Sequence, residues 1–208
     1  MKTVILANGK YPDHKIPLRS LEEADTIVCC DGAVEKLLSH GLEPGAIVGD
    51  LDSIPEELKK NYSSVISGDP DQETNDLTKA VRWCVARGID EVVIVGATGL
   101  REDHTLGNIS LLADYSRMLK VTMLTDTGSF MVIDPGTTIR STPGQQVSIF
   151  SLDPSTGITS TGLRYPLNDL RLHSWWRGTL NEASGDQFSL EFEDGHVIVF
   201  MKYEGENK

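Results

Sequence analysis

The chain has 208 residues, of which 39% are hydrophobic and 24% are charged. These proportions are those of an ordinary globular protein, and they exclude a disordered or fibrous chain. The formal net charge is −12 at pH 7. A protein that binds the phosphate backbone of nucleic acids needs a clustered basic face, so we expect no nucleic-acid partner.

The sequence predicts neither a secretory signal nor a membrane segment. The apolar run at the N-terminus ends at Asn8 and Gly9, which is too short for a signal-peptide core, and no other run approaches membrane-spanning length. Cys29, Cys30 and Cys84 form neither a disulfide framework nor a CxxC zinc pattern. We therefore expect a protein of the reducing cytoplasm with no membrane partner.

Short β-branched runs alternate with helix-like segments through the first two thirds of the chain. The expected strands lie in TVILAN, TIVCCD, AIVGD, SVISG, EVVIVGA, KVTMLT and SFMVID. Apolar residues recur near helical spacing from Gly32 to His40, from Asp76 to Arg87 and from about Thr105 to Met118. Continuous apolar strands between helices are typical of a parallel sheet covered on both faces, which predicts an α/β domain.

The pattern becomes β-rich after Pro135-Gly136. In QFSLEFEDGHVIVFMKY, apolar and polar residues alternate before Asp194-Gly195, a pair that favours a tight hairpin turn. We expect a second, antiparallel β domain, and we divide the chain into residues 1–137 and 138–208.

Acidic residues follow several of the expected strands. Asp31 follows TIVCC, Asp50 and Asp52 follow AIVG in GDLDSI, Asp69 and Asp71 follow SVISG, and Arg101 and Asp103 follow EVVIVGATG. The carboxyl ends of parallel strands share one edge, where ligands bind, so these side chains should converge. Their mutual repulsion favours a bound cation, and carboxylates without Cys or His suit Mg²⁺ holding a polyphosphate. The alternative for GDLDSI alone is a solvated turn before a helix.

Two further motifs extend this site. In DQETNDLTKA, Thr74 or Asn75 can cap a helix that carries Asp76 and Lys79 in its first turns, which is also the pattern of a capped surface helix with an ion pair. In GATGLREDHTLGN, the glycines permit close approach of a ligand, and Arg101 can bind phosphate bidentately. No GxxxxGK[ST] or GxGxxG motif is present. A nucleotide would therefore be bound through a metal ion and side chains instead of through one of these phosphate-binding loops.

The ordered set of motifs resembles the thiamine pyrophosphokinase family along nearly the whole chain. The resemblance rests on GDLDSI, DQETNDLTKA, GLREDH with Asn108 after it, and GLRYPL followed by GTLNE. It implies transfer of the diphosphate of ATP to the hydroxyl of thiamine, giving thiamine diphosphate and AMP. It also implies an α/β domain that binds ATP and magnesium, a C-terminal β-sandwich that binds thiamine, and a homodimer with active sites shared between subunits.

Matching the motifs residue by residue gives the expected site. The resemblance implies Asp50, Asp52 and Asp76 as magnesium ligands, Asp52, Asp76, Arg101 and Asp103 as catalytic residues, and Asp31, Asp50, Thr74, Lys79, Tyr165 and Asn181 as ligand-binding residues. Arg101 or Lys79 would stabilise developing charge, and either Asp52 or Asp103 would accept the hydroxyl proton. The chain has Leu100 and Leu180 where the family usually has glycine and serine.

Two other functions remain open on the residues alone. A metal-dependent phosphohydrolase would use the same acids to activate water, and it would need no acceptor alcohol. A non-catalytic sensor of thiamine diphosphate or a nucleotide would bind without turnover. The complete set of acids argues against the sensor, and the phosphohydrolase differs from the kinase in needing no acceptor alcohol.

Overall fold

A computed structural model describes residues 1–204 of the chain. These residues form two compact units, one spanning Met1–Asp126 and the other beginning at Thr127. Within the described residues, no helix is long and apolar enough to cross a membrane. The assignment of separate functions to residues 1–137 and 138–208 stays a prediction.

The first unit is built on parallel strands in the order β6-β5-β1-β2-β3-β4. These strands are β1 (Thr3–Leu6), β2 (Thr26–Cys30), β3 (Ala46–Gly49), β4 (Ile66–Gly68), β5 (Glu91–Val95) and β6 (Lys120–Leu124). All residues of β1 and β3 are buried, which explains why these strands are apolar without alternation. The α/β class predicted from the sequence is confirmed for this unit.

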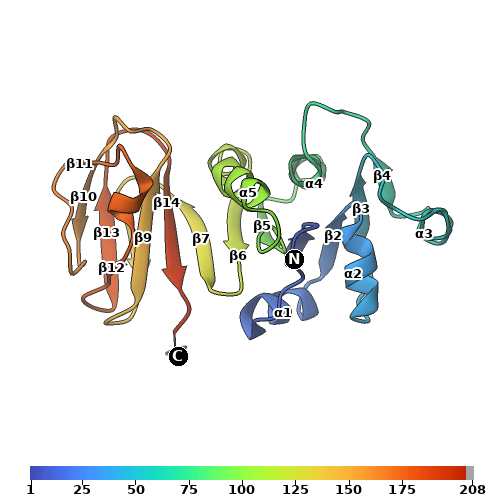
Figure 1. Ribbon diagram of the computed structural model, residues 1–208, viewed down its shortest axis with the longest axis horizontal. Helices are drawn as coiled ribbons and strands as arrows, with labels where there is room; N and C mark the ends of the chain where they lie inside the picture. The colour runs from blue at the N-terminus through green and yellow to red at the C-terminus, as the bar shows by residue number, and fades with distance from the viewer. Residues whose placement is uncertain (205–208) are drawn as a thin grey trace. The chain divides into compact units, whose positions relative to one another are not determined.

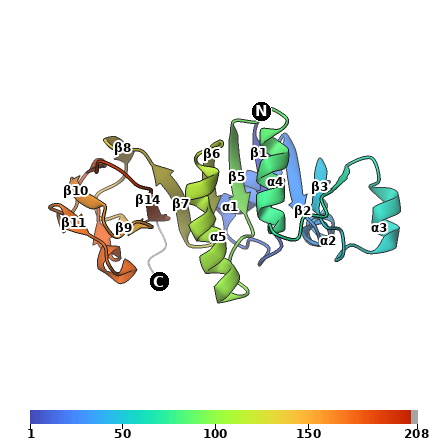
Figure 2. The ribbon, with the colours of Figure 1, turned by 90° about the horizontal axis from the view of Figure 1, so that it is seen from above.

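Helices lie on both faces of this parallel sheet. The helices of the unit are α1 (Lys15–Glu22), α2 (Ala33–Ser39), α3 (Glu56–Asn61), α4 (Asp76–Val85) and α5 (Glu102–Tyr115), of which α3 lies beyond the edge strand β4. Figure 1 shows α4 and α5 on one side of the strands and α1 and α2 on the other. Helix α4 packs on β1, β2 and β3, while α5 packs on β6, and Figure 2 shows both helices along the sheet.

The helix predictions were incomplete. Helix α1 was not predicted, although the shorter α2 was, and α3 begins at Glu56, shortly after GDLDSI, where the alternative interpretation placed a turn before a helix. Helix α5 begins at Glu102, earlier than the expected start near Thr105. Asn75 caps α4, and its side-chain oxygen accepts a hydrogen bond of 2.9 Å from the Thr78 N–H, which resolves the choice between Thr74 and Asn75.

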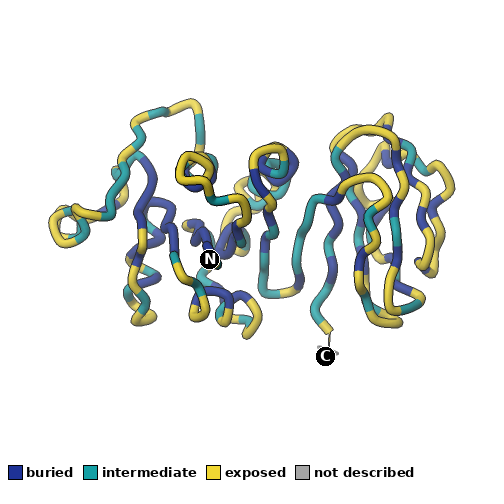
Figure 3. The backbone as a smooth tube through the Cα atoms, turned by 180° about the vertical axis from the view of Figure 1, so that it is seen from behind, coloured by how far each residue is buried: buried dark blue, intermediate teal, exposed yellow. Residues whose placement is uncertain are grey.

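The second unit is a sandwich of two antiparallel sheets, ordered β12-β9-β14-β7 and β11-β10-β13-β8. Its strands are β7 (Gly128–Ile133), β8 (Thr137–Arg140), β9 (Gln146–Ser151), β10 (Gly157–Thr161), β11 (Leu170–Arg171), β12 (Asn181–Glu182), β13 (Gln187–Glu191) and β14 (Val197–Lys202). Ile149 and Val199 of one sheet and Phe188 and Leu190 of the other belong to one buried core. Figure 3 shows this burial along the strands, with exposed turns between them.

The hairpin predicted around Asp194-Gly195 is wrong. Strand β13 pairs with β8 and β10, whereas β14 pairs with β7 and β9 in the other sheet. The connection therefore crosses between the sheets instead of joining neighbouring strands. The turn signal is local, but the choice of partner strands depends on which apolar faces close the core.

Candidate active site

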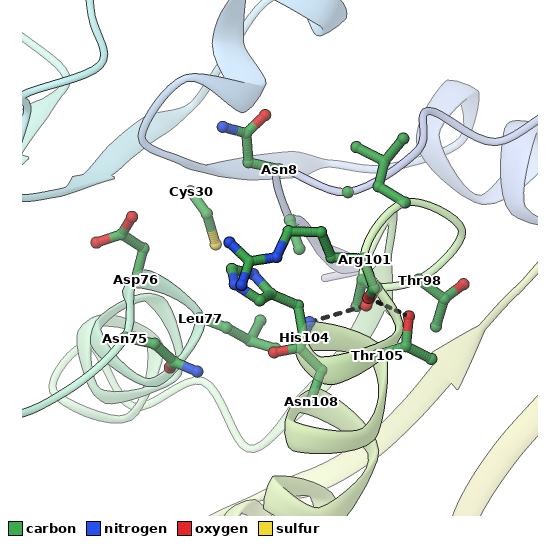
Figure 4. Close-up of a pocket in the computed structure, with 14 residues that line it drawn as sticks. Asn8, Cys30, Asn75, Asp76, Leu77, Thr98, Arg101, His104, Thr105 and Asn108 are labelled. Carbon is green, nitrogen blue, oxygen red and sulfur yellow. Dashed lines mark hydrogen bonds between the residues drawn. The ribbon is translucent and has the colours of Figure 1, made fainter.

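A cavity of about 360 Å³ opens in the first unit. The ends of β1, β2 and β5 and the first turns of α4 and α5 line it, so it lies at the carboxyl edge of the parallel strands. Figure 4 shows Asn8, Asp76, Arg101 and His104 around this space, with side chains from separate segments of the chain. The predicted convergence at this edge therefore includes Asp76 and Arg101.

Asp31 and Asp76 both lie against Gly49, the last residue of β3. A Cβ atom at Gly49 would lie 2.9 Å from the Asp31 Cβ and 3.1 Å from Asp76 Oδ1, so a larger residue would push the two acids away. Asp50 follows directly and is partly buried. The ends of β2 and β3 and the start of α4 thus bring three carboxylates together.

The electrostatics of this group favour a cation. Burial raises the pKa of Asp76 above its ordinary value, and the nearby Asp31 and Asp50 raise it further, although Lys79 opposes them. Asp31 is 3% exposed, and its Oδ1 is buried without a hydrogen-bond partner, while Oδ2 accepts a bond of 3.2 Å from the Ser53 N–H. An unsatisfied buried carboxylate oxygen beside two further carboxylates fits a hard divalent ion such as Mg²⁺.

Asp52 lies at the exposed end of this group. Its N–H donates to Asp50 Oδ1 over 3.2 Å, which closes the turn after β3 and leaves its own carboxylate in solvent. Within residues 1–204, no three Asp, Glu, His or Cys side chains already form a group that could hold a metal. The magnesium ligand set of Asp50, Asp52 and Asp76 stays a prediction.

Lys79 and Thr74 flank the acids on α4 and in the loop before it. The Lys79 side chain is 2% exposed, and its Nζ lies 3.5 Å from Asp76 Oδ1. The Thr74 hydroxyl donates to Asp71 Oδ2 over 2.9 Å. The pKa of Asp71 is lowered first by the hydrogen bond from the Glu73 N–H and then by this hydrogen bond from Thr74. Lys79 therefore contacts the acidic group through Asp76, while Thr74 organises the loop.

Arg101 and Asp103 form a bidentate ion pair at the start of α5. Arg101 Nε donates to Asp103 Oδ1 over 3.1 Å, and Arg101 Nη2 donates to Asp103 Oδ2 over 2.5 Å. Both side chains are largely exposed. The ion pair thus fixes the orientation of the planar guanidinium, and the same two parallel N–H donors can also bind a phosphate group.

Tyr165 and Asn181 lie together in the second unit. Asn181 is buried, and its amide accepts a bond of 3.1 Å from the Tyr165 N–H and donates one of 2.7 Å to the Tyr165 carbonyl oxygen. Asn181 therefore fixes the backbone of Tyr165, a residue that is 58% exposed. Leu180 has a φ of 60° and is 76% exposed, and Trp176 is 74% exposed.

Sequence reasoning did not select several residues that line the cavity. Asn8 and Gly9 follow β1, and Thr98, His104 and Thr105 belong to the segment from β5 into α5. The rule that singled out the acids, namely polar residues directly after a parallel strand, applies equally to Asn8. Asn8 was not selected, because an uncharged amide in an Asn-Gly pair is typical of an ordinary turn.

Two family models match consecutive parts of the chain. The model described as "Thiamin pyrophosphokinase, catalytic domain" matches residues 18–123. The model described as "Thiamin pyrophosphokinase, substrate-binding domain" matches residues 128–200. The two matches follow the division into two compact units.

Individual relatives agree with these matches. Thiamine pyrophosphokinase of Bacillus subtilis (strain 168) is 29% identical, and the match covers 96% of this chain and 98% of that protein. Thiamine pyrophosphokinase 1 of Oryza sativa subsp. japonica is 33% identical over 61% of this chain, and the chain spans only 54% of that relative's length.

Solved structures show the same fold. The crystal structure of thiamine pyrophosphokinase from Bacillus subtilis has a TM-score of 0.78 and 24% identity, covering 98% of this chain and 100% of that chain. Thiamin pyrophosphokinase from Candida albicans has a TM-score of 0.79 and 18% identity, covering 98% of this chain and 90% of that chain.

Proposed function

Because the chain belongs to the thiamin pyrophosphokinase family, we infer that it transfers the diphosphate of ATP to the hydroxyl of thiamine. The products are thiamine diphosphate and AMP. The observation that carries this inference is the pair of family matches, which together extend over both compact units. The acidic group around Gly49 and the guanidinium of Arg101 supply the chemistry that a polyphosphate substrate requires.

The residues of the first unit would hold and orient the nucleotide. Asp31, Asp50 and Asp76 fit Mg²⁺ by charge and by the unsatisfied Oδ1 of Asp31, and Asp52 remains a further predicted ligand. When bound, Mg²⁺ would neutralise charge on the polyphosphate. Arg101 can exchange its Asp103 partner for phosphate oxygens, which would release the Asp103 carboxylate from the ion pair.

Proton removal from the thiamine hydroxyl needs a carboxylate that remains ionised. While the two side chains are paired, the Arg101 guanidinium lowers the pKa of Asp103, so this carboxyl is ionised before the substrate binds. Asp52 is the other predicted acceptor. Since phosphoryl transfer depends mainly on positioning and charge neutralisation, the acceptor contributes less than the groups that hold the polyphosphate.

The second unit supplies the proposed thiamine site. Tyr165 presents an exposed ring on a backbone that Asn181 fixes, and such a ring can stack on a flat cationic heterocycle. Trp176 and Leu180 are large apolar residues that are also exposed. We assign these residues to a homodimer in which thiamine bound mainly by one subunit contacts Tyr165 of the other. The three cysteines are free and buried, which supports the proposal of a reducing cytoplasm.

Incubation of the purified protein with thiamine, ATP and Mg²⁺ tests this function. We expect equal amounts of thiamine diphosphate and AMP, and no reaction without thiamine. Release of phosphate or diphosphate that does not depend on thiamine would instead indicate the phosphohydrolase. Tight binding of thiamine diphosphate without turnover would indicate the sensor. The comparisons support neither alternative.

A further inference from the structure

The loop that follows β1 forms one wall of the cavity. Its backbone is bonded to the segment after β5, because Gly9 N–H donates to the Gly96 carbonyl over 2.7 Å and Lys10 N–H donates to the Thr98 carbonyl over 2.9 Å. A Cβ at Gly9 would lie only 2.4 Å from the Gly96 oxygen, so glycine is required for this close approach. The loop is therefore held firmly along its inner side.

Lys36 of α2 holds the same loop from its other side. The Lys36 Nζ donates to the Asn8 carbonyl oxygen over 3.1 Å, to Asn8 Oδ1 over 2.8 Å and to the Gly9 carbonyl oxygen over 2.7 Å. An ammonium group has three N–H donors, and these three oxygens match them. Lys36 has no donor left for a substrate, so any effect on a ligand must pass through the loop.

The contact with Lys36 also fixes the orientation of the Asn8 amide. Lysine cannot accept a hydrogen bond, so the amide atom that faces it must be the oxygen. The nitrogen, Nδ2, then points to the other side, where it lies 3.0 Å from the position that a Cβ at Gly32 would occupy. Figure 4 draws this nitrogen on the Asp76 side of the residue.

The Nδ2 donors are available to a ligand. Within residues 1–204, the Asn8 NH₂ group makes no hydrogen bond, and Asn8 is an exposed lining residue of the cavity. Gly32 directly follows Asp31, so the NH₂ group lies next to the acids that fit a magnesium polyphosphate. Burial lowers the pKa of Lys36, which agrees with an ammonium group enclosed by the loop instead of one extended into solvent.

We propose that Lys36 is a positioning residue, which orients the Asn8 amide so that its NH₂ group donates to a phosphate oxygen of the bound nucleotide. This role rests on the proposed function, since it assumes that a polyphosphate occupies the cavity. It assigns Asn8 as the residue that contacts the substrate.

The variant Asn8→Asp separates this role from simple stabilisation of the loop. Aspartate keeps the oxygen that Lys36 contacts and adds an ion pair, but it replaces the NH₂ donors by a repulsive oxygen. We expect little change in melting temperature, because the ion pair with Lys36 opposes repulsion from Asp31 and its neighbours, together with a loss of about tenfold or more in affinity for the Mg²⁺ complex of α,β-methylene-ATP measured by calorimetry. The KM for ATP should rise similarly, and the KM for thiamine should change little.

Substitutions at Lys36 complete the experiment. Lys36→Met should weaken binding of the same analogue, Lys36→Arg should restore most of it, and Lys15→Met, which removes an exposed lysine of α1, should leave it unchanged. Wild-type affinity in Asn8→Asp, or a Lys36→Met variant that loses stability but not affinity, would overturn the proposal. Failure of the wild type to bind the analogue would overturn it together with the proposed function. Normal binding without thiamine diphosphate production would reject the function alone.

Discussion

Lys79 is buried against Asp76, with 3.5 Å between Nζ and Oδ1, although Asp76 is also the acid whose pKa is raised by its neighbours. Asp76 therefore has two electrostatic relationships of opposite sign. It is the partner of an enclosed ammonium group, and it is repelled by Asp31 and Asp50. Replacing individual acids of the group should consequently have different effects on stability, even where the effects on activity are similar.

The first prediction concerns Asp76→Asn and Asp50→Asn. Both should lower kcat by about 10²-fold or more, because each removes charge that positions the polyphosphate. In the absence of Mg²⁺, Asp76→Asn should raise the free energy of unfolding less than Asp50→Asn does, because it relieves burial and repulsion of a charge but also removes the partner of the buried Lys79. Asp50→Asn should keep or increase this free energy in the absence of Mg²⁺, because it relieves repulsion.

Denaturant titrations of both variants with and without Mg²⁺ measure these differences. The wild type should gain stability on addition of Mg²⁺, and both variants should gain less. Equal stabilisation of all three proteins by Mg²⁺, combined with near-normal activity, would show that neither acid belongs to a metal site.

The second prediction concerns Arg101→Lys. The lysine keeps the positive charge but cannot form the two parallel hydrogen bonds that Arg101 makes with Asp103. We expect kcat to fall by about tenfold or more with little change in melting temperature, because both side chains are largely exposed. A steady-state assay that found equal kcat values would reduce Arg101 to a general electrostatic role.

The sequence allowed the acids of the first unit to be placed, but not the contacts that orient the neighbouring loop. Asp31 and Asp50 were predicted to converge because strand identity and a common carboxyl edge follow from apolar runs and their order, and Asp76 was added from the helix-start motif DQETNDLTKA. Lys36 was not found, because a lysine on a short helix gives no signal of the three oxygens that it reaches. The turn at Asp194-Gly195 was misread for a related reason, since pairing of β13 and β14 with different sheets is decided by packing of the core.

The third prediction is a pH effect at Asp126. Burial raises the pKa of Asp126, but hydrogen bonds from the His14 and Asp13 N–H groups and from Lys10 outweigh it, so the pKa lies below the ordinary value of 3.8. A lowered pKa in the folded state stabilises the fold above the unfolded value, and this contribution is lost as pH falls through the folded pKa.

Asp126→Asn tests this contribution. At pH 7 the variant should lose roughly 1 kcal/mol of unfolding free energy. Carboxylates titrate between about pH 5 and pH 2, and over this range the stability of the variant should fall less than that of the wild type. Urea titrations at each pH provide the values. Parallel stability curves for the two proteins would mean that Asp126 does not anchor the loop between β1 and α1 through its charge.

The last prediction concerns Tyr165, which is 58% exposed while its backbone is fixed by two hydrogen bonds with the buried Asn181 amide, one donated to the amide oxygen and one donated by the amide nitrogen. Removal of the ring should cost little stability, so a change in kinetics can be assigned to lost stacking on thiamine. Tyr165→Ala should raise the KM for thiamine by about tenfold, with little change for ATP, and Tyr165→Trp should be tolerated. Mixing subunits that carry Asp52→Asn with subunits that carry Tyr165→Ala tests the shared site, because a mixed dimer places both defects in one site and leaves the other intact. At low thiamine, the mixture should therefore exceed the activity of either parent. Activity equal to the mean of the parents, in a mixture shown by native mass spectrometry to contain mixed dimers, would place Tyr165 and Asp52 in the same subunit's site.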